Sequence, residues 1–147
     1  MQLFKKTTAI LSILFWFFTV YLAVPLFASD SKTGALINCD IQHQPCTRQI
    51  SGTIVTLDIQ PRPVKAMKDL IFEVQIKNAD LTRLPMIDLS MPGMKMGRNQ
   101  VTMKMTAKGV YQGTGIIVRC PSGKTVWQAT VNLPGTGSTS FIFDVIY

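Results

Sequence analysis

Apolar and polar side chains alternate regularly in residues 70–77. Every second side chain is apolar, from Phe72 through Val74 to Ile76, and the side chains between them are polar. Successive side chains of a β-strand point to opposite faces of a sheet. This pattern therefore predicts a strand with one buried face and one solvated face.

Two further stretches, 101–106 and 127–133, show the same alternation. In the first of them, Met103 and Met105 fall on the apolar positions. We therefore expect both methionines on the core side of a single strand. Methionine readily fills gaps in a hydrophobic core, so packing is the expected role of these two side chains.

Short strand-like stretches separated by Pro and Gly make up the rest of the chain after residue 48. The segments Lys108-Gly109 and Pro121-Ser122-Gly123 are typical of hairpin turns. About seven strands with no helical stretch between them predict an all-β immunoglobulin-like antiparallel β-sandwich, with a small barrel as the alternative. The expected strands are 50–59, 70–77, 86–89, 100–107, 110–118, 124–133 and 139–147.

The N-terminal region differs in kind, because residues 9–28 form an uncharged apolar run that follows Lys5 and Lys6. A helix of about 20 residues spans roughly 30 Å, which matches the hydrocarbon core of a bilayer. The flanking lysines favour an N-terminus that stays in the cytoplasm. The length of the run favours an uncleaved single-pass anchor in the inner membrane with the C-terminal domain in the periplasm; the alternative is a signal peptide whose cleavage releases the domain to the periplasm.

These patterns divide the chain into three parts. We expect residues 1–28 to be the transmembrane anchor or signal peptide, residues 29–47 a polar tether that contains Cys39 and Cys46, and residues 48–147 the β-sandwich domain. The tether shows neither helical nor strand periodicity.

The inventory of reactive side chains argues against an enzyme. The only histidine, His43, lies in the predicted tether, and the acidic residues show no close pairing for acid–base work. The formal charge of +7 comes from lysines and arginines scattered singly through the chain. Without a basic stripe, we expect no nucleic-acid partner.

Methionine is the unusual feature of the sequence, because six of the eight methionines fall between residues 86 and 105. Thioether sulfur is a soft neutral ligand that selects Cu(I). In the segment Met91-Pro92-Gly93-Met94, proline and glycine suit the two central positions of a type II turn, which brings the flanking methionines close together. Met96 would point the same way as Met94 along an extended chain. The predicted Cu(I) ligands are Met91, Met94 and Met96, with Met86 and Cys120 as weaker ligands.

Three cysteines allow one disulfide in an oxidising compartment. A bond between Cys39 and Cys46 is the simplest pairing, and a metal site formed by these two residues with His43 is the alternative. Cys120 is then a buried core residue, a partner for a tether cysteine, or a thiolate ligand near the methionines.

Several short segments resemble the YtkA-like/FixH-like group of exported domains, namely 88–97 with its Met-Pro-Gly-Met-Lys-Met turn, 109–113, 120–123 and 127–129. The resemblance implies an immunoglobulin-like sandwich behind one N-terminal helix. In the FixH branch it also implies a role in copper delivery to haem-copper oxidases through a cation pump, with Met91, Met94 and Met96 as ligands. The cysteine-bearing tether departs from the family pattern.

The sequence thus predicts a membrane-anchored periplasmic β-sandwich that binds or hands on Cu(I) through its Met-rich loop, in copper handling or oxidase assembly. The expected partners are the membrane and a membrane protein such as a cation pump or oxidase. The alternative function is a metal-free interaction or accessory module of a membrane complex. A thiol–disulfide function of the cysteines is a weaker third hypothesis, because no Cys-x-x-Cys motif is present.

Overall fold

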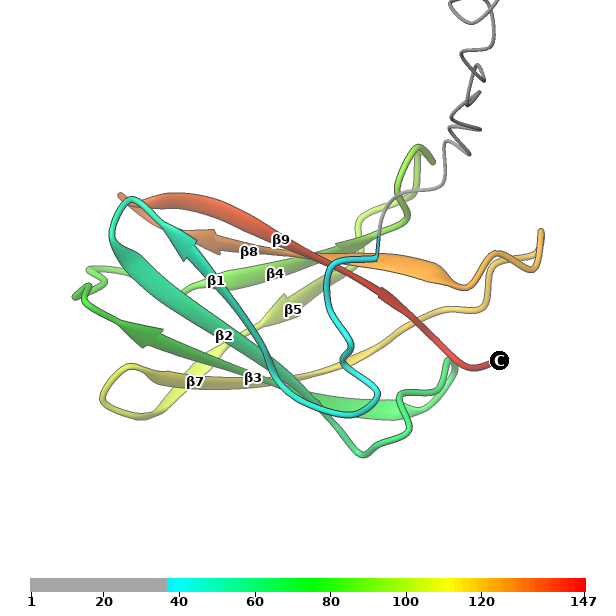
Figure 1. Cartoon of the computed structure of the whole chain (residues 1–147), viewed down its shortest axis with the longest axis horizontal. Helices are drawn as coiled ribbons and strands as arrows, with labels where there is room; N and C mark the ends of the chain where they lie inside the picture. The colour runs from blue at the N-terminus through cyan, green and yellow to red at the C-terminus, as the bar shows by residue number, and fades with distance from the viewer. Residues whose placement is uncertain (1–36) are drawn as a thin grey trace, which may run out of the picture. The chain divides into compact units, whose positions relative to one another are not determined.

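The computed structural model describes residues 37–147, and all the regular secondary structure in them is β-strand. Two antiparallel sheets contain these strands, a five-stranded sheet in the order β1-β2-β3-β7-β6 and a four-stranded sheet in the order β5-β4-β8-β9 (Figure 1). The all-β prediction and its two antiparallel sheets are confirmed. The strands are β1 (Cys46–Ile50), β2 (Thr53–Gln60), β3 (Asp69–Lys77), β4 (Met86–Ser90), β5 (Gln100–Thr102), β6 (Lys104–Ala107), β7 (Val110–Ile116), β8 (Val126–Leu133) and β9 (Gly137–Asp144).

The predicted N-terminal anchor or signal peptide, residues 1–28, lies outside the described residues. Within residues 37–147 there is no helix that is long and apolar enough to cross a membrane.

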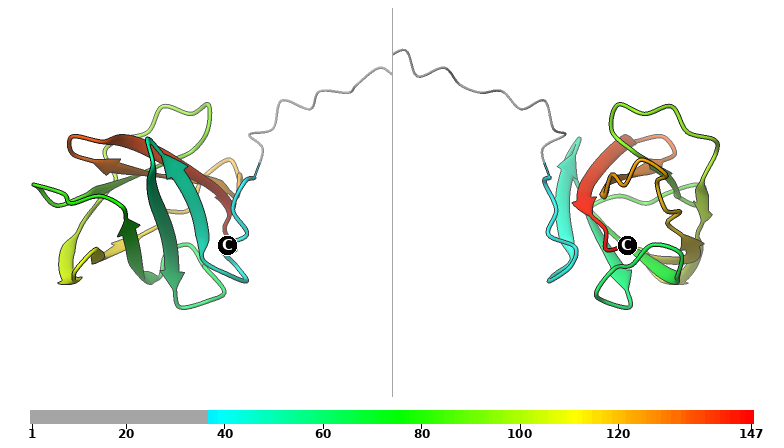
Figure 2. Two further views of the ribbon diagram at one scale, coloured as in Figure 1. Left: turned by 60° about the vertical axis from the view of Figure 1, so that its left-hand side comes forward. Right: turned by 90° about the vertical axis from the view of Figure 1, so that its right-hand side faces the viewer.

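The core lies between the two sheets and follows the alternation seen in the sequence. In β3, β2 and β8, every second side chain is buried, as the apolar positions predict. The two sheets face each other (Figure 2). The side chains on their inner faces contribute to a single apolar cluster. Burying each large apolar side chain stabilises the fold by about 1.5–3 kcal/mol. The largest fully buried side chains include Trp127, Phe72, Phe141 and Phe143.

The prediction of a single strand over residues 100–107 is wrong, because this segment forms two strands that belong to different sheets. Its first part, β5, pairs with β4, and its second part, β6, pairs with β7. Met103, at the crossing, is fully buried, whereas Met105 is 59% exposed. The expectation that both methionines face the core fails for Met105, since the chain leaves one sheet and joins the edge of the other between them.

Two glycines of β7 make room for this crossing. A Cβ atom on Gly113 would lie 2.8 Å from the Val101 side chain and 3.0 Å from the Met103 sulfur. A Cβ atom on Gly115 would lie 2.7 Å from Val101. These separations are shorter than ordinary contacts between heavy atoms. Residues 101–103 can therefore approach β7 this closely only because positions 113 and 115 have no side chain.

The two predicted hairpin turns have different outcomes. Lys108 and Gly109 form the two-residue turn between β6 and β7, with Gly109 at a φ of 72°. The segment 121–123 is also a turn, in which the Gly123 N–H donates to the Cys120 carbonyl at 3.0 Å. However, this turn joins β7 to β8, which belong to different sheets, so it is not a hairpin.

The predicted strand 50–59 is in fact the end of one strand, a turn and most of a second. Ile50 pairs with Thr53 across a two-residue turn, in which Ser51 and Gly52 both have positive φ angles, of 47° and 80°. This combination is typical of the tight turns that join antiparallel strands. The turn separates β2 from β1, an edge strand that the sequence pattern does not predict.

The predicted polar tether is wrong for residues 38–47, because this segment belongs to the β-sandwich. Cys39 is 4% exposed and Ile41 is fully buried. The backbone N–H groups of Asn38 and Cys39 both donate to the carbonyl of Ile142 in β9, at 2.9 and 3.1 Å. Since β1 starts at Cys46, the ordered fold begins earlier in the chain than the expected boundary at residue 48.

Candidate soft-metal site and the disulfide loop

The methionine loop, residues 91–99, connects β4 to β5 and opens with the predicted turn. The Met94 N–H donates to the Met91 carbonyl at 3.1 Å, and Gly93 has a φ of 72°. Proline at the first central position and a glycine with positive φ at the second are the features of a type II turn. The local sequence therefore fixes the start of the loop.

Met94 and Met96 are half-buried and line the same depression, which has a volume of about 400 Å³. Lys95, which lies between them, is exposed. This arrangement agrees with the expectation that alternate residues of an extended segment point the same way. Two methionines thus line one space at the surface, and both also pack against the apolar core. The other residues of the depression are Asp88, Leu89, Ser90, Gly97, Arg98 and Gln100.

Met91 differs from Met94 and Met96 because its side chain is buried in the core. Its side chain is 3% exposed and belongs to the core, and it does not line the depression. The reason is visible in β4, where Ile87 and Leu89 are buried and Met91 continues the same alternation one step beyond the strand. The structure therefore brings together Met94 and Met96, and places Met91 beneath the surface.

Met86 lies on the opposite face of β4 from Met91. It is half-buried and shares this outer face with Asp88 and Ser90. Because alternate residues of a strand are about 7 Å apart, the Met86 side chain lies one step along the strand from Asp88, which lines the depression. Met86 does not itself line the depression.

Polar residues around the two thioethers were not foreseen from the sequence. Asp88 and Gln100 are paired across β4 and β5, and both line the depression. Arg98 also lines it, so that one carboxylate and one guanidinium face the same space. The alternation of β4 could have placed Asp88 on the outer face, but its pairing with Gln100 depends on the register of two separate strands.

Harder metal ligands do not gather elsewhere in this part of the chain. Residues 37–147 contain no group of three or more His, Cys, Asp or Glu side chains that could hold a metal ion. Thioether groups fall outside that set of ligand types. The depression with Met94 and Met96 is therefore the place in the described structure where a soft metal would find two sulfur ligands together.

Cys120 is the unpaired cysteine, and its side chain is buried at 5% exposure. Its thiol lies 3.0 Å from the Ser122 hydroxyl, and this hydrogen bond lowers the pKa of the thiol while desolvation by burial acts in the opposite direction. Cys120 does not line the depression. The sequence left three roles open for Cys120, and the structure shows it as a buried core residue.

The loop around Cys120 is held by Tyr147. The tyrosine hydroxyl accepts hydrogen bonds from the Cys120 N–H at 3.1 Å and from the Trp127 indole at 3.3 Å, and it donates to the carbonyl of Lys124. This loop leads into β8, whose Gln128 pairs with Ser90 at the start of the methionine loop. The two loops therefore lie at the same end of the four-stranded sheet.

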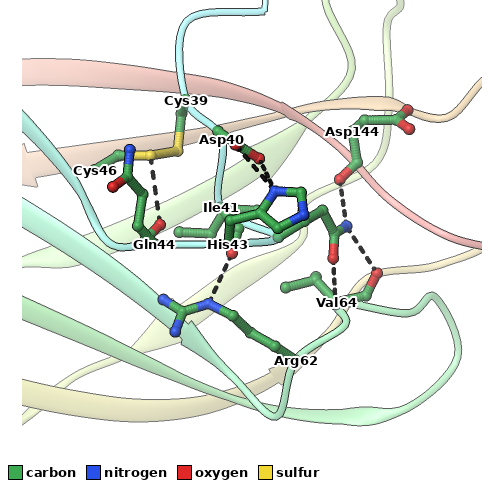
Figure 3. Close-up of polar contacts among 10 residues, drawn as sticks. Cys39, Asp40, Ile41, His43, Gln44, Cys46, Arg62, Val64 and Asp144 are labelled. Atoms are coloured by element: carbon green, nitrogen blue, oxygen red, sulfur yellow. Dashed lines mark hydrogen bonds and ion pairs between the residues drawn. A yellow bond between two sulfur atoms is a disulfide. The ribbon is translucent and has the colours of Figure 1, made fainter.

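The predicted disulfide between Cys39 and Cys46 is present, with the two Cα atoms 5.5 Å apart (Figure 3). The alternative metal site with His43 is wrong, because both sulfurs are bonded to each other. The His43 ring is exposed, and its Nδ1 atom lies 2.8 and 3.0 Å from the two carboxylate oxygens of Asp40.

Side-chain hydrogen bonds tie this disulfide loop, residues 39–46, to distant parts of the fold. The Gln42 amide donates to the carbonyls of Val64 at 3.2 Å and Asp144 at 2.9 Å, and its oxygen accepts from the Val64 N–H at 2.7 Å. The Arg62 Nε atom donates to the Ile41 carbonyl at 2.9 Å (Figure 3). Arg62 also forms an ion pair with Asp58. The disulfide loop is thus part of the structure that positions β1 and the C-terminal strand.

Comparison with known proteins yielded no relative for this chain: no family model, no curated protein and no solved structure matched it. The fold and the residues described above are therefore the grounds on which a function is argued.

Proposed function

We propose that this protein is a membrane-anchored, exported β-sandwich that binds or hands on Cu(I) through its methionine loop. The observation that supports this function best is the position of Met94 and Met96, which both line one surface depression. Thioether sulfur prefers Cu(I) over harder metal ions, and this depression has two residues with such a ligand. Met91 is the third proposed ligand, and its burial means that the loop must shift before that sulfur can join the other two.

The environment of the depression is compatible with a bound monovalent cation. The Asp88 carboxylate favours positive charge nearby, while Arg98 opposes it, so the two side chains offset each other. The remaining attraction must then come from the soft sulfur atoms. A site of this kind selects its metal by ligand softness rather than by charge.

Export is supported by two independent features. The apolar run 9–28 is long enough to cross a bilayer. The disulfide between Cys39 and Cys46 is typical of proteins that fold in an oxidising compartment such as the periplasm. Methionine is a suitable copper ligand there, because unlike cysteine it is not lost to disulfide formation.

We also propose that the two sheets form an immunoglobulin-like sandwich. Strands β2-β3-β7-β6 and β4-β8-β9 follow the order of the A-B-E-D and C-F-G strands in immunoglobulin domains. This order supports an immunoglobulin-like sandwich, as the resemblance to YtkA-like/FixH-like domains implies. By the same resemblance, the proposed partners are a cation pump or a haem-copper oxidase under assembly.

The test is an anaerobic competition titration of the detergent-solubilised full-length protein with Cu(I) and a chromophoric chelator. Met94→Leu/Met96→Leu should weaken Cu(I) binding by more than about 100-fold, because the loss of mere outer-shell partners of a metal already weakens binding by about 10- to 100-fold. The matched control is Met67→Leu/Met105→Leu, which removes two exposed methionines outside the depression and should leave the affinity unchanged. Equal affinities for the two double variants would contradict the proposal.

A metal-free interaction module is the second proposed function. It is favoured by exposed apolar side chains in residues 37–147, of which Met67 and Met105 are the most exposed, at 63% and 59%. Such side chains are typical of surfaces that contact other molecules. Binding of a membrane-protein partner that persists under copper chelation, and that is lost when these side chains are replaced, would favour this function over the first.

A further inference from the structure

An apolar patch lies where the first residues of β3 meet the last residues of β7. The two strands are neighbours in the sheet (Figure 1). They run antiparallel, and Asp69 pairs with Ile116. Ile71 and Ile116 are therefore diagonal neighbours on the outer face of the five-stranded sheet, and they are 46% and 44% exposed. Four of the exposed apolar side chains gather here. They are Met67, Ile71, Ile116 and Val118, and we call them the Met67 patch.

Met67 is held at this position by its backbone. Its N–H donates to the Ile117 carbonyl at 2.8 Å, which places it beside Val118. Its φ of 58° is in the left-handed region, which glycine or asparagine adopts with much less strain. Such strain persists only where the surrounding structure imposes it, and it concentrates at functional positions. Here it presents a large apolar side chain, 63% exposed, to the solvent.

Basic side chains adjoin the residues of the Met67 patch in the sequence. Lys65 and Lys68 flank Met67 in the chain, Arg119 follows Val118, and all three are exposed. The exposed carboxylate of Asp69 lies on the same outer face, directly across from Ile116, so the three cations outnumber one acidic group. Aliphatic side chains with an excess of cations beside them are the composition that attaches peripheral segments to anionic lipid surfaces.

The length of the chain limits how far this domain can lie from a bilayer. Only nine residues, 29–37, separate the apolar run 9–28 from Asn38, the first residue bonded to β9. Nine residues extend at most about 30 Å, and a tether this short keeps the local lipid concentration high enough for a weak contact to be populated.

A bilayer fits the size of the Met67 patch better than a second copy of this chain does. Stable protein–protein interfaces bury about 800 Å² on each partner, which is far more than four partly exposed aliphatic side chains provide. A tethered lipid contact does not need that area.

We propose that the Met67 patch, together with Lys65, Lys68 and Arg119, docks the β-sandwich onto the anionic headgroups of the membrane in which the chain is anchored. This inference rests on the membrane anchor of the proposed function and is independent of copper binding. Docking fixes the orientation of the domain, because the patch covers one end of the five-stranded sheet. Low salt and anionic lipid favour docking.

The experiment reconstitutes the full-length protein into vesicles of phosphatidylcholine, with or without phosphatidylglycerol, that carry a quencher on the lipid headgroup. A fluorophore is placed on Thr114→Cys, which pairs with Ile71 and leaves the patch intact, in a Cys120→Ser background. The control label is on Lys108→Cys, in the hairpin next to Val110, which pairs with Gln75. The pairing partners Gln75 and Asp69 are six positions apart on β3, which places the control roughly 20 Å from the patch.

We expect the label at residue 114 to be quenched in anionic vesicles, and the label at residue 108 to be unaffected. Quenching should disappear in about 1 M salt, where the Debye length falls to about 3 Å. Each of Lys65→Gln, Lys68→Gln and Arg119→Gln should lower the docking equilibrium by roughly fivefold. Quenching of both labels to the same extent, or of neither, would overturn the proposal.

Met67→Gly separates docking from folding. Glycine relieves the strained φ angle, so this variant should unfold at a higher temperature than the parent protein and yet dock more weakly. Unchanged docking in this variant would show that the Met67 side chain does not contact the membrane, and would contradict the proposed docking surface.

Flotation with phosphatidylcholine vesicles tests the anchor separately. A chain that does not float with these vesicles lacks the anchor. Its co-flotation with anionic vesicles, with and without the patch substitutions, then measures docking directly.

Discussion

The disulfide loop, residues 39–46, and the methionine loop, residues 91–99, contrast in how they are held. The disulfide loop contains a fully buried Ile41, a covalent cross-link and the side-chain hydrogen bonds of Gln42 to two other segments. The methionine loop is fixed at its start by a turn, but Met94 and Met96 lie half-buried at the rim of a depression. The first loop is cross-linked and partly buried, whereas the second leaves two of its methionines partly exposed.

The contrast teaches that polarity is a poor guide to order when the partners are distant. Residues 38–47 look like a flexible tether because their local pattern is polar, yet they are bound to residues more than 20 and more than 100 positions away. The methionine loop has three methionines, yet Met94 and Met96 are only half-buried. The two loops should therefore differ in how much they contribute to the free energy of unfolding.

The largest effect is expected from Ile41→Ala. Truncation of a fully buried isoleucine leaves a cavity and should lower the free energy of unfolding by about 2–5 kcal/mol. The measurement is urea unfolding of the detergent-solubilised chain, followed by the fluorescence of the buried Trp127 in a Trp16→Phe background. Ile37→Ala is the matched control, because Ile37 is 53% exposed. Equal stabilities of these two variants would show that the loop is not part of the core.

Removal of the disulfide comes next. A bond that closes a loop of about eight residues should contribute roughly 2.5 kcal/mol by restricting the unfolded chain. Cys39→Ala/Cys46→Ala should therefore unfold at lower urea concentration than the parent protein. Reductant should destabilise the parent but leave the double variant unchanged. A stabilising or neutral double substitution would contradict the assigned role of the bond.

Gln42→Ala should have a somewhat smaller effect, of about 1–3 kcal/mol, because it leaves the Val64 N–H without its acceptor and removes the amide donor from the carbonyls of Val64 and Asp144. The Val64 carbonyl keeps the Ile146 N–H as a donor. The comparison is with Gln44→Ala, an exposed glutamine in the same loop. Both variants are measured by the same urea unfolding. If Gln44→Ala were the more damaging of the two, the hydrogen bonds of Gln42 would not be what holds the loop.

The smallest effect on stability is expected in the methionine loop. Met94→Leu/Met96→Leu exchanges half-buried side chains for others of similar volume, and should change the free energy of unfolding by less than about 1.5 kcal/mol. The same variant is expected to lose Cu(I) binding. A large loss of stability would show that these methionines serve packing and would weaken the case for a metal site.

Much of the sheet structure could be predicted because alternation is a local property. Residues 70–77 and 127–133 alternate and form strands with one buried face. The crossing at Met103 could not be predicted, since the pattern continues unbroken while the chain changes sheets. Its cause is the space left by Gly113 and Gly115, which are distant in sequence from Val101.

The candidate site was predictable to a similar degree. The turn at Met91 follows from Pro92 and Gly93, whose backbone preferences are local. The burial of Met91 could also have been inferred, because it extends the alternation of Ile87 and Leu89. The other residues of the depression could not, as they meet only through the pairing of β4 with β5.

The most direct test of the copper-binding account is an NMR titration of the full-length protein labelled with ¹³C at the methionine methyl groups, under anaerobic conditions. Single substitutions to leucine assign the signals. The account predicts that stoichiometric Cu(I) shifts the methyl resonances of Met94 and Met96, while those of Met67, Met103 and Met105 stay in place. A spectrum in which Cu(I) leaves Met94 and Met96 unmoved would contradict it.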